Sequence, residues 1–276
     1  MPGDFFRSVI PENEDEADLP DIDTSVAHIA RVYDYWLGGK DHFAADREVG
    51  DEVLEIHPET ALSVRANRAF LARAVGYLAA QGIRQFLDIG TGLPTVDNTH
   101  EVAQAAAPAS RVVYVDNDPI VLSHARALLT SGPEGATAYL DADVRDVDTV
   151  LARARELLDF GQPIGVLLIA LLHMLGDEDD PWGLVARYMA AVPPGSYLVL
   201  SHLASDVQAE TMAAMRRRIN ELMPQHVHMR TKDQVTAFFG GMPLVEPGVV
   251  LTHQWRPGTG AAVAGGVLWA GAARKP

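Results

Sequence analysis

The sequence predicts an α/β fold in which a mostly parallel β-sheet is covered by helices on both faces and ends in an antiparallel strand. Three observations predict this fold. Five short apolar runs alternate with helical stretches between residues 84 and 200, two strand-like runs follow residue 243 with no helix between them, and residues 25–80 carry apolar side chains at helical spacing. A chain of 276 residues is long enough for one such domain with additions.

The segment from Ser25 to Ala80 is predicted to be helical, because apolar side chains recur at steps of three and four residues. Gly38, Gly39 and Pro58 interrupt this periodicity and divide the segment into separate helices. We therefore expect residues 25–82 to form a helical lid segment and residues 83–276 to form the sheet domain.

Residues 1–24 have a different composition from the rest of the chain. They hold eight acidic side chains and one basic one, so this stretch accounts for −7 of the formal charge of −15. Its apolar content is low, and it lacks the basic region followed by an apolar run that marks a signal peptide. We expect residues 1–24 to be a disordered acidic arm.

The predicted parallel strands are five apolar runs, and near-continuous apolar character suits strands that are buried on both faces. They are Gln85–Ile89, Arg111–Val115, Ala136–Leu140, Ile164–Ile169 and Ser196–Leu200. Two further runs, Leu244–Leu251 and Ala262–Ala272, are joined by a turn at Pro257–Gly260. Because no helix separates them, they are predicted to pair as an antiparallel hairpin.

Composition excludes several classes of protein. The excess of 37 acidic over 22 basic residues disfavours binding to nucleic acid and to an anionic membrane surface. No apolar stretch is long enough to span a bilayer, so we expect a cytoplasmic protein. The absence of Cys removes disulfides, thiolate nucleophiles and Cys-ligated metals.

The first strand leads directly into Gly90, Thr91 and Gly92, a G-x-G loop of the kind that lets a backbone approach a ligand. By itself this spacing is a weak signal. Asp116 at the end of the second strand and Asp143 after the third strengthen it, since an acid at the end of strand two accepts ribose hydroxyls. Capping of the helix that begins near Pro119 suits Asp118 better than Asp116.

A dinucleotide site requires a third glycine in the pattern G-x-G-x-x-G, and this sequence has none at the required position. Asp88, near the end of the strand, points into the same loop, where its carboxylate would repel a pyrophosphate but attract the ammonium group of a cationic ligand. The loop therefore favours S-adenosylmethionine over a nicotinamide cofactor.

Several longer strings carry a resemblance that extends from about Asp21 to the C-terminus. They are Arg31–Asp41, Asp46–Arg47, Arg65–Phe70, Gln85–Pro94, Tyr114–Pro119, Leu172–His173 and Gly195–His202. In these strings the chain resembles the class I S-adenosylmethionine-dependent methyltransferases and, more closely, an actinobacterial S-adenosyl methyltransferase family first catalogued as a domain of unknown function. The resemblance implies a Rossmann-like, seven-stranded, mostly parallel sheet with a C-terminal antiparallel strand.

The resemblance also implies a cofactor site for S-adenosylmethionine, with S-adenosylhomocysteine as product and no metal. It places Gly90, Thr91 and Gly92 against the methionine and ribose, and Asp88 near the amino group. Asp116 takes the ribose hydroxyls and Asn117 flanks the adenine, while Asp143 and the backbone of Val144 recognise the adenine amino edge. Ala170 and Leu171, after the fourth strand, complete the site. Pro94 departs from the family pattern, because many methyltransferases have a small residue there.

Aromatic and basic side chains gather around Gly38 and Gly39, including Tyr33, Tyr35, Trp36 and Lys40. They form either a lid that excludes water from the cofactor or the core face of a helix that Gly38 ends, and both interpretations can hold together. In either case Arg31, Tyr35 or Lys40 is a candidate to reach the pocket. Arg65 and Arg68 share a helical face, and their partner is either a substrate carboxylate or Asp46.

His173 follows the fourth strand on the substrate side of the expected cofactor site. It is either a general base for methyl transfer or a structural histidine packed beneath the cofactor. His202 is a weaker candidate for the same role. The acidic run Asp177–Asp180 is interpreted as a solvated helix start, and His226 with His228 lacks a third metal ligand.

The sequence therefore predicts a methyltransferase that acts on oxygen or nitrogen of an unidentified small molecule. Strand four lacks the Asp/Asn-Pro-Pro-aromatic tetrad of many amino-group methyltransferases, which disfavours adenine, cytosine and glutamine acceptors. The alternative is a non-catalytic, regulatory protein that binds S-adenosylmethionine on the same fold. A homodimer is compatible with either function.

Overall fold

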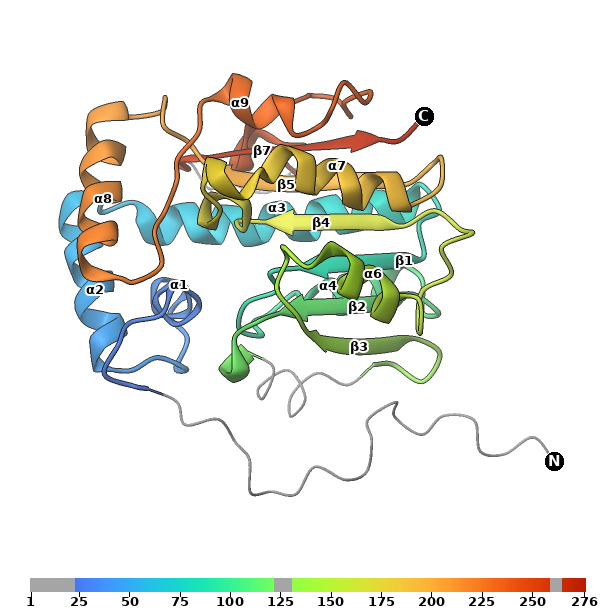
Figure 1. Cartoon of the computed structure of the whole chain (residues 1–276), viewed down its shortest axis with the longest axis horizontal. Coiled ribbons are helices and arrows are strands. Elements are labelled where there is room, and N and C mark those ends of the chain that lie inside the picture. Colours follow the sequence, from blue (N-terminus) through green and yellow to red (C-terminus); the bar gives the residue numbers. More distant parts are fainter. Residues whose placement is uncertain (1–22, 122–130, 259–264) are drawn as a thin grey trace.

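A computed structural model describes residues 23–121, 131–258 and 265–276 (Figure 1). The predicted acidic arm therefore lies outside the described residues, apart from Asp23 and Thr24, of which Thr24 belongs to a turn. None of the helices in the described ranges is long and apolar enough to cross a membrane.

The centre of the molecule is a seven-stranded sheet with the order β3-β2-β1-β4-β5-β7-β6. Its strands are β1 (Gln85–Ile89), β2 (Arg111–Asp116), β3 (Ala136–Asp141), β4 (Gly165–Ile169), β5 (Tyr197–Leu203), β6 (Val250–Leu251) and β7 (Leu268–Arg274). The first five pair in parallel, and β7 runs antiparallel to both β5 and β6. The predicted fold class is confirmed, and each of the five predicted parallel strands is present.

The C-terminal hairpin is less regular than its apolar pattern predicts. Of the run Leu244–Leu251, only β6 forms a strand, and Leu244 adds one isolated bridge to Ala273. Pro243 precedes this run and Pro247 interrupts it, and a proline has no N–H to give to a ladder. A turn in which the Gly248 N–H donates to the Val245 carbonyl at 2.8 Å takes the place of the strand. Residues 262–264 of the second predicted run lie outside the described residues.

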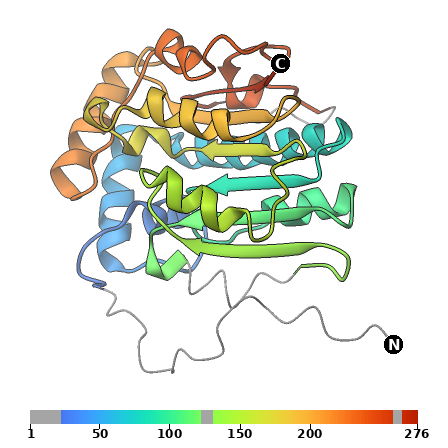
Figure 2. The ribbon, with the colours of Figure 1, turned by 45° about the vertical axis from the view of Figure 1, so that its right-hand side comes forward.

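Helices cover both faces of the sheet (Figures 1 and 2). On one face α6 (Val147–Ala154) and α7 (Pro181–Ala191) pack against side chains such as Leu87 and Ile89. On the other face α3 (Thr60–Ala80) and α4 (Thr99–Ala106) pack against Phe86 and its neighbours. Because side chains alternate along β1, Asp88 shares the α3/α4 face with Phe86.

A third apolar cluster lies at the carboxyl ends of the parallel strands, where α1, α2 and α8 stand together at the left of Figure 1. The bounds of these helices are α1 (Ile29–Leu37), α2 (Ala44–Ile56) and α8 (Ala209–Leu222). The short α9 (Lys232–Ala237) follows α8, and three 3-10 turns span Leu172–Met174, Asp177–Asp179 and Thr252–Gln254.

The predicted breaks in the N-terminal helices occur as the sequence indicates. Gly38 ends α1 with a φ of 85°, a left-handed conformation that glycine adopts without a steric penalty, and α2 ends at Ile56 before Pro58. The helices of segment 25–82 lie in two different parts of the molecule. Its helices α1 and α2 pack with α8, whereas α3 lies along the sheet as part of its covering layer.

Candidate functional site

A cavity of about 570 Å³ opens at the carboxyl ends of the central strands, between the sheet and the helices α1, α3 and α8. Its volume lies within the range of roughly 300–1,000 Å³ that small-molecule sites occupy. The lining of the cavity has two parts, which follow the order of the strands. Loops after β1, β2 and β3 supply one end, and residues of α1, α3 and α8 supply the other.

The loop after β1 brings backbone close to the cavity. Gly90 and Gly92 have φ values of 73° and 66°, so both require glycine or strain. The Gly90 N–H donates to the Val115 carbonyl at 2.8 Å. A Cβ at Gly90 would lie 2.6 Å from Cδ1 of Leu171, and the loops after β1 and β4 therefore touch at this glycine. Thr91 lines the cavity beside them.

Asp116, at the end of β2, holds this loop in place. Its two carboxylate oxygens accept hydrogen bonds from the backbone N–H groups of Gly92 at 2.9 Å and Asp118 at 3.0 Å. Burial raises the pKa of Asp116, and the two N–H donors oppose that rise. Each oxygen keeps a second lone pair, and the residue lines the cavity.

Asp88 is the most deeply buried acid of the predicted site, with 5% of its surface exposed. The Thr99 hydroxyl, at the start of α4, donates to its Oδ2 at 2.6 Å. Burial raises the pKa of Asp88 to about 6, and the Thr99 hydrogen bond moderates the rise. Because a buried carboxylate is costly without a positive partner, this position favours a cationic ligand group.

The end of the site beside β3 is a network of polar side chains. Asn117 donates to Asp143 Oδ2 at 3.3 Å, and Arg145 donates to the same oxygen at 2.9 Å. Arg145 also donates to Asp179 at 2.8 Å. Val144 is buried next to this network, and all five residues line the cavity.

A chain of hydrogen bonds connects α1 to the sheet across the floor of the cavity. The Ala170 N–H donates to Ser201 Oγ at 3.0 Å, and the Ser201 hydroxyl donates to Asn67 Oδ1 at 2.6 Å. Asn67 Nδ2 then donates to the Tyr33 hydroxyl at 3.0 Å. Ala170 has a φ of 53°, which is unusual for a residue with a Cβ, and its N–H also donates to the Ser201 carbonyl.

His173 lines the cavity just beyond β4 and is 6% exposed. Its Nδ1 is buried and has no hydrogen-bond partner within the described residues. Burial lowers the pKa of His173 well below its usual range, and His202, Arg230 and His228 add to the effect through charge repulsion. His173 therefore stays neutral at physiological pH.

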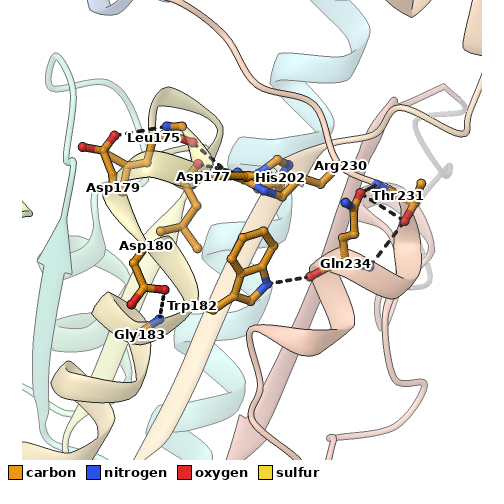
Figure 3. Close-up of polar contacts among 12 residues, drawn as sticks. Leu175, Asp177, Asp179, Asp180, Trp182, Gly183, His202, Arg230, Thr231 and Gln234 are labelled. Atoms are coloured by element: carbon orange, nitrogen blue, oxygen red, sulfur yellow. Dashed lines mark hydrogen bonds and ion pairs between the residues drawn. The ribbon is translucent and has the colours of Figure 1, made fainter.

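Arg230 holds the segment that carries His173 (Figure 3). Its guanidinium donates to the carbonyls of Leu172 and Leu175 and to Nε2 of His202, each at 3.0 Å, and to Asp177 at 2.7 Å. It also stacks on Trp182, 4.8 Å from the ring centroid. The His228 N–H donates to the His173 carbonyl at 2.7 Å, so the segment after α8 is bound to this loop at two points.

The lid candidates do not all reach the cavity. Tyr33 lines it, whereas Arg31 is buried in an ion pair with Asp46 at 3.0 Å. The hydroxyl of Tyr35 donates to Asp51 at 2.5 Å, while Lys40 and Arg65 are exposed. Of these residues, the structure thus brings only Tyr33 to the cavity wall. The partner of Asp46 is Arg31 rather than Arg65 or Arg68.

The residues outside the predicted site that line the cavity include Arg68, His28 and Ser63. Arg68 lies one turn beyond Arg65 on α3, donates weakly to the carbonyls of Val96 and Asp97, and keeps a buried Nε without a hydrogen-bond partner among the described residues. His28 contacts Asp118 through Nδ1 at 2.8 Å and so links α1 to the loop after β2. Ser63 has a buried, unpartnered hydroxyl. Around the axis of α3, Arg68 lies closer than Arg65 to the direction of the buried Asn67. This helical position is the sequence signal that favours Arg68 over Arg65 as a cavity residue.

The acidic run after β4 forms structural contacts. Asp177 pairs with Arg230, Asp179 pairs with Arg145, and Asp180 accepts from the Gly183 N–H as the N-cap of α7. Asp118 likewise caps the turn that follows it, since the Ile120 N–H donates to its Oδ1 at 2.9 Å. Within the described residues no cluster of His, Asp or Glu forms a candidate metal site.

Comparison with known proteins gives a consistent result. A family model described as S-adenosyl methyltransferase matches residues 15–276. The chain is 44% identical to a DUF574 family protein from Streptomyces avermitilis, with a TM-score of 0.88, over 92% of this chain and 99% of that one. It is 42% identical to a candidate methyltransferase from Thermobifida fusca, with a TM-score of 0.85, over 93% and 97% of the two chains.

More distant structures share the fold alone. The S-adenosylmethionine-dependent methyltransferase SibL, in its apo form, has a TM-score of 0.51 and 19% identity over 79% of this chain and 56% of that one. A search of curated proteins finds no match to this chain.

Proposed function

The chain belongs to the S-adenosyl methyltransferase family, and we propose that it transfers a methyl group from S-adenosylmethionine to oxygen or nitrogen of a small molecule. The observation that carries this proposal is the pairing of two acids in one cavity. Asp88 is buried and forms no ion pair among the described residues, although the charge of Arg68 lowers its pKa. Asp116 holds the G-x-G loop at the end of β2, where we expect the ribose acceptor.

The residues of the cavity fit the cofactor. An ammonium group suits Asp88, and a carboxylate suits the unpartnered Nε of Arg68. Gly92 has nothing within 4 Å of the place where a Cβ would stand, which leaves room beside Asp116. The methionine and ribose parts of S-adenosylmethionine would therefore meet complementary groups between β1 and β2.

We assign the remaining roles from position along the sheet. Asp116 would accept the ribose hydroxyls, and Asn117 and Asp143 with the Val144 backbone would border the adenine, because they follow β2 and β3. Ala170 and Leu171 would lie against the reactive end, because they follow β4 and Leu171 touches Gly90. When bound, the cofactor supplies an electrophilic methyl group, and the protein's own contribution is to align the acceptor and exclude water.

His173 would act on the acceptor rather than on the cofactor. Its imidazole is neutral, its Nδ1 lacks a partner within the described residues, and it follows β4 on the side of α8. A neutral ring nitrogen accepts a hydrogen bond from an O–H or N–H group. It can take the proton once that group has become strongly acidic through bonding to the methyl carbon. The low pKa of His173 makes it a weak base toward a free acceptor.

Helices α1 and α2 would serve as a cover for the reaction. Tyr33 lines the cavity and is tied to the sheet through Asn67 and Ser201, and His28 contacts Asp118 across the nucleotide end. Both contacts cross from α1 or its N-cap to the sheet domain. These contacts must break before the cover can open.

The proposal is tested in two stages. Calorimetry with S-adenosylmethionine, S-adenosylhomocysteine and NAD measures the cofactor preference, and we expect the first two to bind and NAD to fail. An acceptor screen that detects S-adenosylhomocysteine then measures turnover, with His173→Ala as the probe of the acceptor side. If neither S-adenosylmethionine nor its product binds, the proposal is wrong. If both bind and no acceptor yields product, a non-catalytic binding protein is the better interpretation.

A further inference from the structure

The end of the cavity farthest from the nucleotide loops has a lining that disfavours charged ligands. We propose that the acceptor is a neutral, largely apolar small molecule with one hydroxyl or amine, bound in a chamber between α1, α3 and α8. This inference rests on the proposed function and specifies its substrate class. The chamber is defined by Trp36, Leu37, Val64, Met174, Met215 and Ile219, which line the cavity and belong to one apolar cluster.

The chamber lining is apolar on several sides. Trp36 and Leu37 come from α1, Val64 from α3, and Met215 and Ile219 from α8. The Trp36 indole is already satisfied, because its N–H donates to the Gly50 carbonyl. Transfer of an apolar ligand surface from water into such a lining is favourable, at roughly 25 cal/mol per Å². The two methionines are flexible and polarizable, so the chamber can adapt to different ring shapes.

Four buried polar atoms of residues that line the cavity lack a hydrogen-bond partner within the described residues. Arg68 Nε and Gln225 Oε1 are two of them, and the other two are candidates to bind the polar group of the ligand. These candidates are Ser63 Oγ on α3, in a residue that is 2% exposed, and His173 Nδ1, in a residue that is 6% exposed. A buried polar atom without a hydrogen bond costs about 1–3 kcal/mol, and a ligand that supplies the bond recovers this cost. Ser63 can donate or accept, and the neutral His173 ring can accept through Nδ1 if Nε2 carries the proton.

The charges around the cavity exclude an anionic acceptor. Of the Arg and Lys residues in the described ranges, Arg68 and Arg145 line the cavity. Arg145 is bound to Asp143 and Asp179 at the nucleotide end, and Arg68 contacts the loop after β1. The chamber residues are uncharged, and the nearby Asp34 carboxylate already accepts the Asp41 N–H at 2.9 Å. An acceptor carboxylate or phosphate would be desolvated there without compensation.

Three matched aromatic probes test the charge selection: 2-naphthol, 2-naphthoate and 2-naphthylmethylammonium. Their binding is measured by fluorescence on the full chain saturated with S-adenosylhomocysteine. We expect 2-naphthol to bind at least about tenfold more tightly than either charged probe, since burial of an unpaired charge is costly. Equal or tighter binding of a charged probe overturns the proposal.

Two variants test the location. Met215→Trp fills the chamber and should abolish binding of 2-naphthol, whereas Arg216→Trp, on the exposed side of the same helix, should leave it unchanged. Ser63→Ala removes an unpaired hydroxyl, so it should weaken the binding of 2-naphthol about fivefold to tenfold without lowering the stability of the protein. Binding that is unaffected by both Met215→Trp and Ser63→Ala overturns the assignment.

The same samples separate this inference from the proposed function. Binding of S-adenosylhomocysteine to the wild-type chain is measured before each probe is added. If the nucleotide binds and 2-naphthol does not, the substrate class is wrong and the cofactor site stands. If the nucleotide itself fails to bind, the proposed function is wrong.

Discussion

Arg230 donates a hydrogen bond from Nη1 to Nε2 of His202 at 3.0 Å, and this contact settles the protonation of a buried imidazole. A guanidinium only donates, so Nε2 must accept, and the proton resides on Nδ1, which donates to the Leu203 carbonyl at 2.9 Å. Burial is the largest cause that lowers the pKa of His202 to about 3. The rings of His202 and His173 meet edge to face at 5.6 Å, which places a fixed neutral ring beside the candidate base.

Substitution Arg230→Gln removes the charge but keeps a donor for His202. We expect the pKa values of His173 and His202 to rise, since the repulsion by Arg230 is lost while their burial remains. The free energy of unfolding should fall by about 3 kcal/mol, because carbonyls of Leu172 and Leu175 lose a charged donor. Histidine titration by NMR and urea denaturation measure the two effects. The exposed Arg217→Gln is the control, and an unchanged titration of His173 would contradict the assignment.

Substitution Asp88→Asn should separate stability from binding. A carboxyl whose pKa rises from 3.8 to about 6 on folding destabilises the protein by about 3 kcal/mol at neutral pH. The folded state binds the extra proton between these pH values, so this contribution to stability falls as pH rises from about 4 to about 6. We expect the variant to be more stable at pH 7 and to lack this slope.

The same variant should bind S-adenosylmethionine at least about tenfold more weakly, because an amide cannot pair with an ammonium group. Thermal unfolding across pH 4–8 and calorimetry measure both properties. Thr99→Val serves as the comparison, since it removes the donor to Asp88 and leaves the carboxyl in place. A variant that is less stable than wild type at pH 7 would show that Asp88 is not strained in the free protein.

Substitution Asp116→Ala should weaken the binding of S-adenosylhomocysteine by about 10- to 100-fold, the range expected when hydrogen bonds to a charged acceptor are lost. The loop after β1 also loses the acceptor for the Gly92 N–H. Asp141→Ala is the matched control, because Asp141 ends the adjacent strand β3 and is exposed. Calorimetry decides, and equal affinities of the two variants would rule out the ribose role of Asp116.

Substitution Asn67→Ala should loosen α1. It leaves the hydroxyls of Ser201 and Tyr33 without their side-chain partner, at a cost of about 2–3 kcal/mol in unfolding free energy. Arg65→Ala, exposed on the same helix, should change stability by less than about 0.5 kcal/mol. Hydrogen exchange of the α1 amides should accelerate in Asn67→Ala alone. Similar protection of α1 in both variants would refute the link between α1 and the sheet.

Local patterns determined the sheet and the G-x-G loop after β1. The run Gln85–Ile89 is confirmed to the residue as β1, because its apolar side chains and the following glycines carry their own conformational preferences. Asp88, Gly92 and Asp116 lie together because parallel strands end at one edge of a sheet. In the hairpin, by contrast, the apolar pattern predicted a strand over residues 244–251 that Pro247 interrupts.

Only the tertiary structure decided the partners of the charged side chains. Arg31 pairs with Asp46, which is 15 positions away in the sequence, and Arg230 contacts His202, which is 28 positions away. At such separations the spacing along the chain does not predict which side chains meet. The orientation of α3 likewise turns Arg68 toward the cavity and leaves Arg65 exposed. The sequence by itself therefore determined the fold class and the G-x-G loop after β1, because short-range periodicity and turn chemistry encode them. The apolar chamber depended on the packing of α1, α3 and α8, because long-range contacts set which side chains are buried and which remain unpaired.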